Sequence, residues 1–208
     1  TPDVSSAASD VYKRQGVNHV GHFVLGLGMM DLMAKADGAR LVTLSSIGHR
    51  MSGMRFDDMH FTRDPYEKWT AYGQSKTAQA LFAISLNARM NERGVEAFSV
   101  HPGGIFTPLQ RHLPTEEMAA LGWTDETGKP SERAAALFKT PAQGATTSLW
   151  CATNPRLAGK GGVYCEDCDI AALVADEDAS MAGVRGWAVD EGAADKLWDV
   201  TERLLAEA

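Results

Sequence analysis

Hydrophobic residues follow two different periods along the chain, and their alternation predicts helices and strands in turn. Residues 17–38 carry apolar positions at the spacing of one helix face, with Gly38 at the end. The short apolar runs 39–46 ("ARLVTLSS") and 95–102 ("VEAFSVHP") predict strands that are buried on both faces. Between them, residues 66–93 have the pattern of a long helix that is closed by a glycine.

The rest of the chain continues this alternation. Residues 103–140 are punctuated by prolines and predict a loop with short helices, whereas 141–153 predict a helix with proline in its first turn. A strand is expected at 161–167 and a terminal helix at 191–206. Strands that alternate with helices are typical of βα units, so the pattern predicts an α/β fold with a doubly wound parallel sheet of about three strands and flanking helices.

Bulk properties exclude several classes of protein. The chain has 208 residues, a net charge of −7 and a pI of about 5.3, which argues against nucleic-acid or anionic-membrane binding. No apolar run approaches the roughly 18 residues that a membrane span requires. The first residues resemble no secretory signal, and three cysteines are too few for a disulfide framework in a chain of this length. We therefore expect a cytoplasmic protein.

Polar side chains gather where the predicted strands end. Ser45 and Ser46 end the first strand, and a His-Pro-Gly-Gly sequence at 101–104 ends the second. Ligands of parallel α/β sheets bind at the carboxyl ends of the strands. Tyr72 and Lys76 lie four residues apart, on one face of the helix that begins at this edge. An ammonium beside a phenol favours the phenolate, so the pair is a candidate general acid and base.

Five segments carry a resemblance to a known family. They are "GVNHVGHF" (16–23), "ARLVTLSSIGH" (39–49), "WTAYGQSK" (69–76), "VHPGGIFT" (100–107) and "GGVYCEDCDIA" (161–171). With them the chain resembles the short-chain dehydrogenases/reductases, and it is most similar to the branch of retinol-dehydrogenase-like and WW-domain-oxidoreductase-like enzymes. The wide interval between Ser46 and Tyr72 departs from many family members but fits this branch. The resemblance implies a Rossmann-like fold.

The resemblance also implies a reaction and roles for individual residues. The reaction is the NAD(P)-dependent interconversion of a small-molecule alcohol and a carbonyl compound. Tyr72 would be the general acid or base, Lys76 would tune it and bind the nicotinamide ribose, Ser46 would hold the substrate oxygen, and Asn18 would hold a water linked to Lys76. The nicotinamide would be lined by these residues: Tyr72, Lys76, Pro102, Gly103, Ile105 and Thr107.

Neither the substrate nor the preferred dinucleotide follows from the resemblance. Apolar residues within 108–140 favour an apolar substrate. NAD and NADP are not distinguished, because the residues that decide between them would follow a strand that this sequence does not contain.

Other residue groups have both a structural and a chemical interpretation. The C-x-x-C of Cys165 and Cys168 has no second ligand pair, so no metal site is expected. Asp57 and Asp58 are expected in a solvated loop, and His101 is interpreted as structural, with a place facing the site as the alternative. The other histidines considered are expected in loops and on helix faces: His19, His22, His49 and His60.

Two further functions stay open beside the reductase. One is a non-catalytic interaction domain derived from a reductase, although such a module has no need to keep the asparagine, serine, tyrosine and lysine together. The other is an epimerase or dehydratase that uses the same tyrosine and lysine pair.

One motif of the family is absent from the sequence. A dinucleotide-binding sheet begins with a glycine-rich turn that holds the pyrophosphate, T-G-x-x-x-G-x-G in this family, and the chain contains none. Residues 1–15 are polar and aperiodic and indicate a leader foreign to the family, while 16–208 would be the catalytic and substrate half of one domain. About three βα units, on the order of 90 residues, would then be missing upstream. The first strand would then form an exposed edge of the sheet, which favours self-association into a homo-oligomer.

Overall fold

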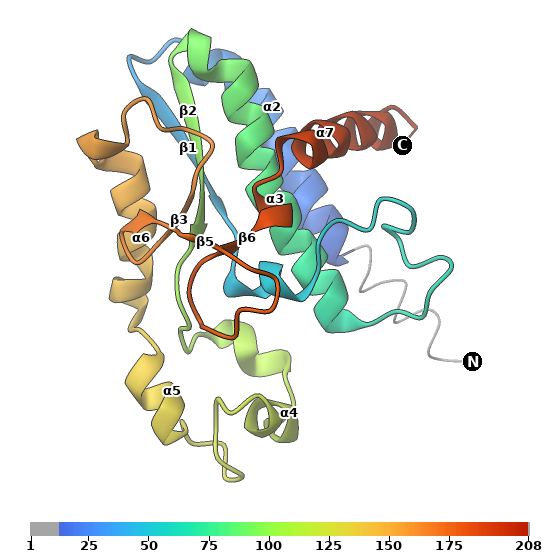
Figure 1. The fold of residues 1–208 in the computed structure, drawn as a ribbon, viewed down its shortest axis with the longest axis vertical. Helices are drawn as coiled ribbons and strands as arrows, with labels where there is room; N and C mark the ends of the chain where they lie inside the picture. Colours follow the sequence, from blue (N-terminus) through green and yellow to red (C-terminus); the bar gives the residue numbers. More distant parts are fainter. Residues whose placement is uncertain (1–12, 208) are drawn as a thin grey trace.

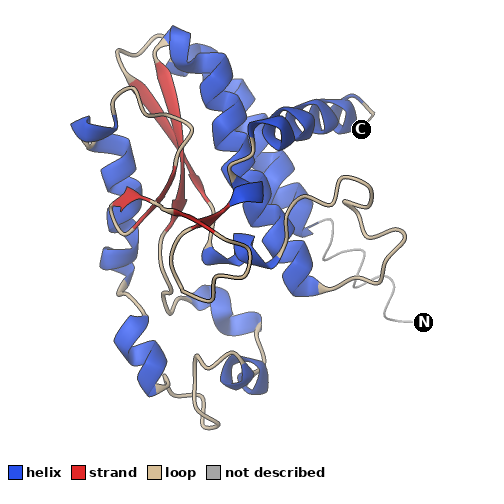
Figure 2. Ribbon diagram, viewed as in Figure 1, coloured by secondary structure: helices blue, strands red, loops and turns tan. Residues whose placement is uncertain are grey.

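A parallel β-sheet forms the centre of the molecule. In the computed structural model, which describes residues 13–207, three strands run parallel and a fourth pairs antiparallel at one edge (Figures 1 and 2). Their spatial order is β1 (Ala39–Leu44), β2 (Val95–His101), β3 (Tyr164–Glu166) and β4 (Asp169–Ile170). Ala39 lies opposite Val95 and Ser99 lies opposite Tyr164, so the carboxyl ends of β1, β2 and β3 share one edge.

Helices cover both faces of this sheet. On one face lie α2 (His22–Met33) and α3 (Lys68–Met90), and both η1 (Lys13–Gly21) and α7 (Glu191–Ala206) pack against α3. On the other face lies α6 (Pro141–Thr153), as Figure 1 shows. The prediction of an α/β fold with a parallel sheet between helical layers is confirmed.

Apolar side chains fill the spaces between the sheet and its helices. Beneath α2 and α3 the rings of Phe23 and Phe82 lie with their centres 5.4 Å apart, and Trp198 from α7 packs edge-on against Phe23 at 4.7 Å. On the α6 side, Phe98 and Val100 of β2 belong to a second buried cluster. Because β2 is buried on both faces, its sequence is a nearly continuous apolar run rather than an alternating one.

Local residues explain where α3 begins and ends. The Glu67 carboxylate accepts hydrogen bonds from the backbone N–H groups of Trp69 (2.9 Å) and Thr70 (2.6 Å), so the helix begins at Lys68, slightly later than the sequence pattern predicts. After a short 3₁₀ turn, Gly94 adopts a φ of 77°, a left-handed conformation that suits glycine and directs the chain into β2.

Short elements connect the layers, and the sequence pattern misses several of them. The strand β4 adds an antiparallel edge, and β5 (Leu173–Val174) pairs with β6 (Val184–Arg185) in a separate two-stranded sheet. Two residues are too few to show a hydrophobic period. The short helices are η2 (Ile47–Met51), η3 (Asn91–Arg93), η4 (Pro108–His112), α4 (Thr115–Ala120), α5 (Glu132–Leu137), η5 (Pro155–Leu157) and η6 (Gly186–Ala188).

One side of the molecule presents apolar side chains to solvent. Among the described residues β1 has only β2 as a strand neighbour, and Leu44 at its end is 53% exposed. On the adjacent helix α2, Leu25 and Leu32 are 60% and 65% exposed. An open strand edge next to exposed apolar residues is a surface on which another segment or chain can pack.

Two sequence predictions concern the ends and the membrane. Most of the leader predicted at 1–15 falls on residues 1–12, which lie outside the described residues. Between residues 13 and 207, no helix combines the length and the apolar character that crossing a membrane requires.

Candidate active site

Tyr72 and Lys76 lie one turn apart near the start of α3. Their spacing places the Lys76 Nζ atom 5.7 Å from the centre of the Tyr72 ring. The same atom donates a hydrogen bond of 3.0 Å to the carbonyl oxygen of Leu44, the last residue of β1. The start of α3 therefore brings a phenol and an ammonium to the carboxyl edge of the sheet.

Burial changes the acidity of Lys76. The side chain is half-buried, and the loss of solvation lowers its pKa from 10.5 to about 8. The ammonium is still mainly protonated at pH 7, but it titrates much closer to that pH than a solvated lysine does. A lysine with a lowered pKa in such a place is typical of a functional site.

The turn after β1 brings Ser46 to the Tyr72 ring. Ser46 is the N-cap of η2, and its Oγ atom accepts a hydrogen bond of 3.1 Å from the Gly48 N–H group. A Cβ atom at Gly48 would lie 2.5 Å from Tyr72 Cε1 and 3.4 Å from Ser46 Oγ. Both side chains therefore approach the same point. The neighbouring Ser45 donates to the backbone carbonyl of Lys76 at 2.8 Å, which leaves Ser46 as the serine at the tyrosine.

Asn18 reaches α3 from η1. Its side-chain N–H group donates to Ser75 Oγ at 3.2 Å, and the Ser75 hydroxyl donates to the backbone carbonyl of Tyr72 at 2.8 Å. Gln79 donates to the backbone carbonyl of Asn18. The helix η1 has a π-helical hydrogen-bond pattern, which is frequent at functional sites. Asn18 thus contacts the turn of α3 that carries Tyr72.

The end of β2 lies beside the Ser46 turn. His101 Nδ1 accepts hydrogen bonds from the backbone N–H groups of Ile47 (3.1 Å) and Gly103 (3.3 Å), which ties the turns after β1 and β2 together. Burial lowers the pKa of His101 to about 4, so its ring is neutral and acts as an acceptor. This geometry favours the structural interpretation of His101, and it brings Pro102 and Gly103 to the same rim.

Ile105 and Thr107 lie farther along this loop, and their hydrogen bonds run to η4. The Ile105 carbonyl accepts from Gln110 Nε2 at 2.8 Å, and Thr107 Oγ1 caps η4 by accepting from the Leu109 N–H group at 3.2 Å. The contacts that the sequence predicts between these two residues and a nicotinamide stay predictions.

Other residues singled out by the sequence have structural roles. Asp58, expected in a solvated loop, is buried, and hydrogen bonds led by the one from the Asp64 N–H group hold its pKa well below its usual range. His19 is buried as well, 2.8 Å from Thr201 Oγ1. Cys165 is a free, buried thiol in β3. Within residues 13–207, no group of three or more His, Cys, Asp or Glu side chains is placed to hold a metal ion.

Two residues that contact the Ser46 carbonyl, His49 and Tyr164, do not follow from the sequence as part of the site. His49, interpreted as a loop residue, is completely buried, and Tyr164 is not singled out at all. The Tyr164 hydroxyl donates to the Ser46 carbonyl at 3.1 Å, and the rings of His49 and Tyr164 lie with their centres 4.9 Å apart. The position of His49 three residues after Ser46 is the only sequence signal for this contact.

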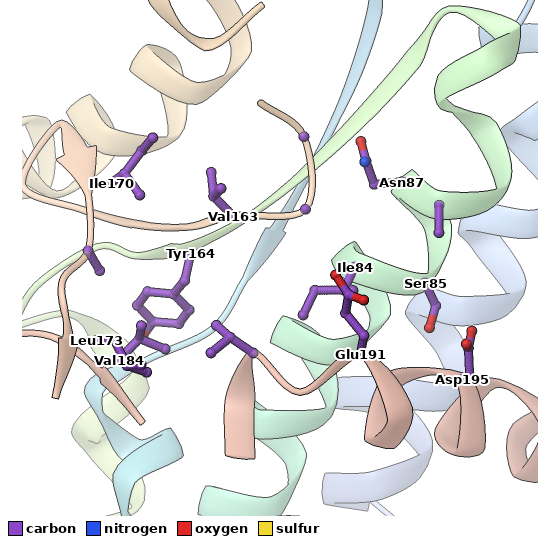
Figure 3. A pocket seen from close by; sticks show the side chains of 15 residues that line it. Ile84, Ser85, Asn87, Val163, Tyr164, Ile170, Leu173, Val184, Glu191 and Asp195 are labelled. Carbon is purple, nitrogen blue, oxygen red and sulfur yellow. The ribbon is translucent and has the colours of Figure 1, made fainter. Parts of the chain in front are cut away.

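A groove of about 480 Å³ lies along the later turns of α3 (Figure 3). Ile84 and Asn87 line one side, and Tyr164 and Leu173 line the other. Ile84 is three turns further along α3 than Tyr72, about 18 Å at 1.5 Å per residue. Tyr72, Lys76 and Ser46 do not line the groove, although the hydroxyl of Tyr164, which does, donates to the Ser46 carbonyl.

The fold and the site together define a class of protein: a parallel α/β domain whose sheet edge carries a serine and a tyrosine–lysine pair. The family model described as short chain dehydrogenase matches residues 3–118, more than half of the sequence. The chain belongs to the short-chain dehydrogenase/reductase family. This match begins inside the segment 1–15 that is predicted to be a foreign leader, and that assignment stays a prediction.

Individual relatives agree with this assignment. A probable oxidoreductase of Streptomyces lividans is 42% identical over 182 residues, which cover 88% of this chain and 60% of that protein. Retinol dehydrogenase 14 of Homo sapiens is 33% identical over 195 residues, which cover 91% of this chain and 51% of that protein. The chain thus spans little more than half the length of the curated relatives it matches.

Solved structures share the fold. An uncharacterized protein from Mycobacterium paratuberculosis has a TM-score of 0.57 at 26% identity, over 91% of this chain and 57% of that one. A 3-hydroxyacyl-CoA dehydrogenase type-2 from Mycobacterium avium has a TM-score of 0.51 at 16% identity, over 80% of this chain and 56% of that one. At that identity the second likeness concerns the fold alone.

Proposed function

We propose that this chain is the catalytic half of an NAD(P)-dependent oxidoreductase that interconverts an alcohol and a carbonyl group. The observation that carries the proposal is the meeting of three groups at one sheet edge. The Lys76 ammonium lies 5.7 Å from the Tyr72 ring centre, and Ser46 Oγ and the same ring both approach Gly48. A proton donor, a positive charge and a hydroxyl are what the protein would contribute to carbonyl reduction, and the dinucleotide would contribute the hydride.

Each group has a definite part in the reaction. When bound, the dinucleotide supplies or accepts the hydride at the substrate carbon. In the reductive direction the Tyr72 hydroxyl gives its proton to the substrate oxygen, so that a carbonyl becomes an alcohol, and in the oxidative direction the phenolate takes that proton back. Lys76 stabilises the negative charge that remains on the tyrosine oxygen, and Ser46 donates a hydrogen bond to the substrate oxygen as charge develops there.

The residues at the edge suit the nicotinamide end of a dinucleotide. An ammonium has three donors, and one of those on Lys76 is used by the Leu44 carbonyl, so donors remain for the hydroxyls of a ribose. Gly103 lies at the same rim with a φ of 93°, a left-handed conformation that suits glycine, and the Lys139 side chain lies against it. The sequence has no glycine-rich turn for the pyrophosphate, so the chain would lack the half that holds the adenine end, and the choice between NAD and NADP stays open.

The surroundings of Tyr72 favour an apolar substrate. Half-buried aromatic rings extend from it in a row: Trp69 lies 6.1 Å from Tyr72, Trp123 lies 6.4 Å from Trp69, and Phe138 lies 6.0 Å from Trp123, between ring centres. Glu117 holds this row by accepting a hydrogen bond of 3.0 Å from Trp69 Nε1. Rings that stay partly exposed beside a reacting group can bury an apolar ligand.

Titration of NADPH and NADH into the 208-residue chain tests the missing half. Without a pyrophosphate cradle the dissociation constant is expected to be millimolar or weaker. A micromolar constant would show that the chain holds the whole dinucleotide and that the fragment hypothesis is wrong.

The Tyr72→Phe variant tests the reaction. In a version of the chain extended through its own upstream coding sequence, removal of the hydroxyl should lower carbonyl reduction by at least about 100-fold, the usual contribution of a general acid. Dinucleotide affinity should stay the same. The matched control is Tyr66→Phe, which removes a hydroxyl from a residue outside the site and should leave turnover unchanged. Equal activity of the Tyr72→Phe and parent chains would refute the acid–base role.

A further inference from the structure

The proton position on His49 follows from its neighbours. His49 is completely buried, and its Nε2 atom lies 3.1 Å from the backbone nitrogen of Arg185 in β6. A backbone N–H group only donates, so Nε2 is the acceptor and Nδ1 carries the ring proton. Nδ1 lies 2.8 Å from the Ser46 carbonyl oxygen and therefore donates to it. Burial lowers the pKa of His49 to about 4, in keeping with a neutral ring.

The Ser46 carbonyl is held by more than this one bond. It also accepts the backbone N–H group of His49 at 3.0 Å and the Tyr164 hydroxyl at 3.1 Å. Tyr164 lines the groove of Figure 3 but is only 2% exposed, and its hydroxyl is directed to the Ser46 carbonyl. Three donors from η2 and β3 thus converge on one carbonyl oxygen.

The position of the Ser46 carbonyl determines where Ser46 Oγ and the Tyr72 ring lie. The peptide plane between Ser46 and Ile47 sets where the Ser46 side chain leaves the backbone, and Oγ then accepts the Gly48 N–H group at 3.1 Å. Gly48 in turn lies against the Tyr72 ring, with room for no Cβ atom. A rotation of the turn would move Ser46 Oγ and the surface that supports the tyrosine ring together.

We propose that His49 and Tyr164 are positioning residues that lock the Ser46–Gly48 turn, so that Ser46 Oγ and the Tyr72 hydroxyl keep the separation that one substrate oxygen requires. This role rests on the proposed reaction. Neither residue touches the substrate: both ring nitrogens of His49 are engaged with backbone groups, and the Tyr164 hydroxyl lies on the carbonyl side of Ser46. Small errors in the placement of catalytic groups are costly to the rate.

Two substitutions of His49 separate positioning from general stability. Asparagine places its amide at the position of Nδ1 and keeps the donor to Ser46, whereas glutamine reaches the position of Nε2 and keeps the acceptor for Arg185. His49→Asn and His49→Gln each lose one of the two bonds. If His49 only stabilises the fold, both variants should lose similar amounts of catalytic rate and of protection of the turn. If His49 positions Ser46, His49→Gln should lose more of both than His49→Asn.

The first readout needs no turnover. Hydrogen exchange of the Gly48 amide reports whether the turn is locked, because that N–H group is bonded to Ser46 Oγ. We expect exchange about tenfold faster in His49→Gln than in His49→Asn, from the loss of one hydrogen bond. The exposed His60→Gln variant is the control and should exchange as the parent chain does. Equal exchange in the two His49 variants would overturn the proposal.

The second readout is steady-state kinetics on the extended chain. His49→Gln and Tyr164→Phe should each lower kcat by roughly two- to tenfold with little change in KM, because Ser46 acts mainly in the transition state. His49→Asn should retain more of the parent kcat than His49→Gln at equal or lower stability. If kcat follows the melting temperature across these variants, the residues are structural and the proposal fails. If Gly48 exchange differs between the His49 variants but the parent chain shows no turnover, the positioning of the turn is supported and the proposed reaction is refuted.

Discussion

Replacement of Lys76 by methionine should remove a cost in stability that the folded chain carries near neutral pH. The Lys76 side chain is half-buried, and its pKa falls from 10.5 to about 8 because burial disfavours the ammonium. At about 1.4 kcal/mol per pH unit, this difference means that the protonated lysine destabilises the fold by up to about 3 kcal/mol relative to the neutral amine. Methionine fills a similar space and carries no charge.

The pH dependence has a definite sign. Between pH 8 and about 10.5 the unfolded chain binds a proton at Lys76 that the folded chain has lost, so the free energy of unfolding of the parent rises with pH there. The slope is at most about 1.4 kcal/mol per pH unit, and below pH 7 it vanishes because both states are protonated. The Lys76→Met chain lacks this rise. The lost hydrogen bond to Leu44 shifts its whole curve by a nearly constant amount.

Urea unfolding from pH 6.5 to 10.5 measures this difference. The stability of Lys76→Met relative to the parent should fall by about 3 kcal/mol between pH 7 and 10.5, and other titrating groups cancel in the comparison. Lys160→Met, a change at an exposed lysine, is the control and should run parallel to the parent. Parallel curves for Lys76→Met as well would refute the reasoning, because they would mean that burial does not disfavour the ammonium. A half-buried lysine with a lowered pKa is typical of a functional site.

Two further substitutions test the neighbouring contacts and the exposed face. Gly48→Ala should lower the free energy of unfolding by about 1–3 kcal/mol, because the new Cβ atom would lie 2.5 Å from Tyr72 Cε1. It should also reduce turnover more than a substitution far from the site that destabilises the fold equally. An unchanged melting temperature and activity would show that the Tyr72 ring can move aside. The double variant Leu25→Gln/Leu32→Gln should weaken the expected self-association of the chain, measured by sedimentation velocity, because both leucines of α2 are largely exposed. Its free energy of unfolding should change by no more than about 0.5 kcal/mol. If the variant associates as strongly as the parent, the self-association uses another surface.

The sequence predicts the layers of the fold because their signals are local. The strand β2 is a continuous apolar run and α3 has a long apolar period, so both follow from their own residues. The strands β4, β5 and β6 are two residues long, and they are defined by their hydrogen bonds to a neighbouring strand. They are too short for a hydrophobic period, so the sequence does not predict them. The same limit applies to Asp58, whose burial depends on how the loop up to Asp64 folds back onto its carboxylate.

In the candidate site, too, contacts between residues close in sequence are predictable and contacts between distant residues are not. Tyr72 and Lys76 are neighbours on one helix, so spacing alone predicts that their side chains meet. The partners of His49 are 115 and 136 residues away along the chain, at Tyr164 in the central sheet and Arg185 in the two-stranded sheet, and only the folded chain brings them to the turn after β1. A pair of side chains on one helix can therefore be predicted from a motif, whereas contacts between residues far apart in the sequence depend on the fold. A comparison of His49→Gln with Tyr72→Phe addresses that division directly, since the first should disturb the geometry of the turn and the second only the proton.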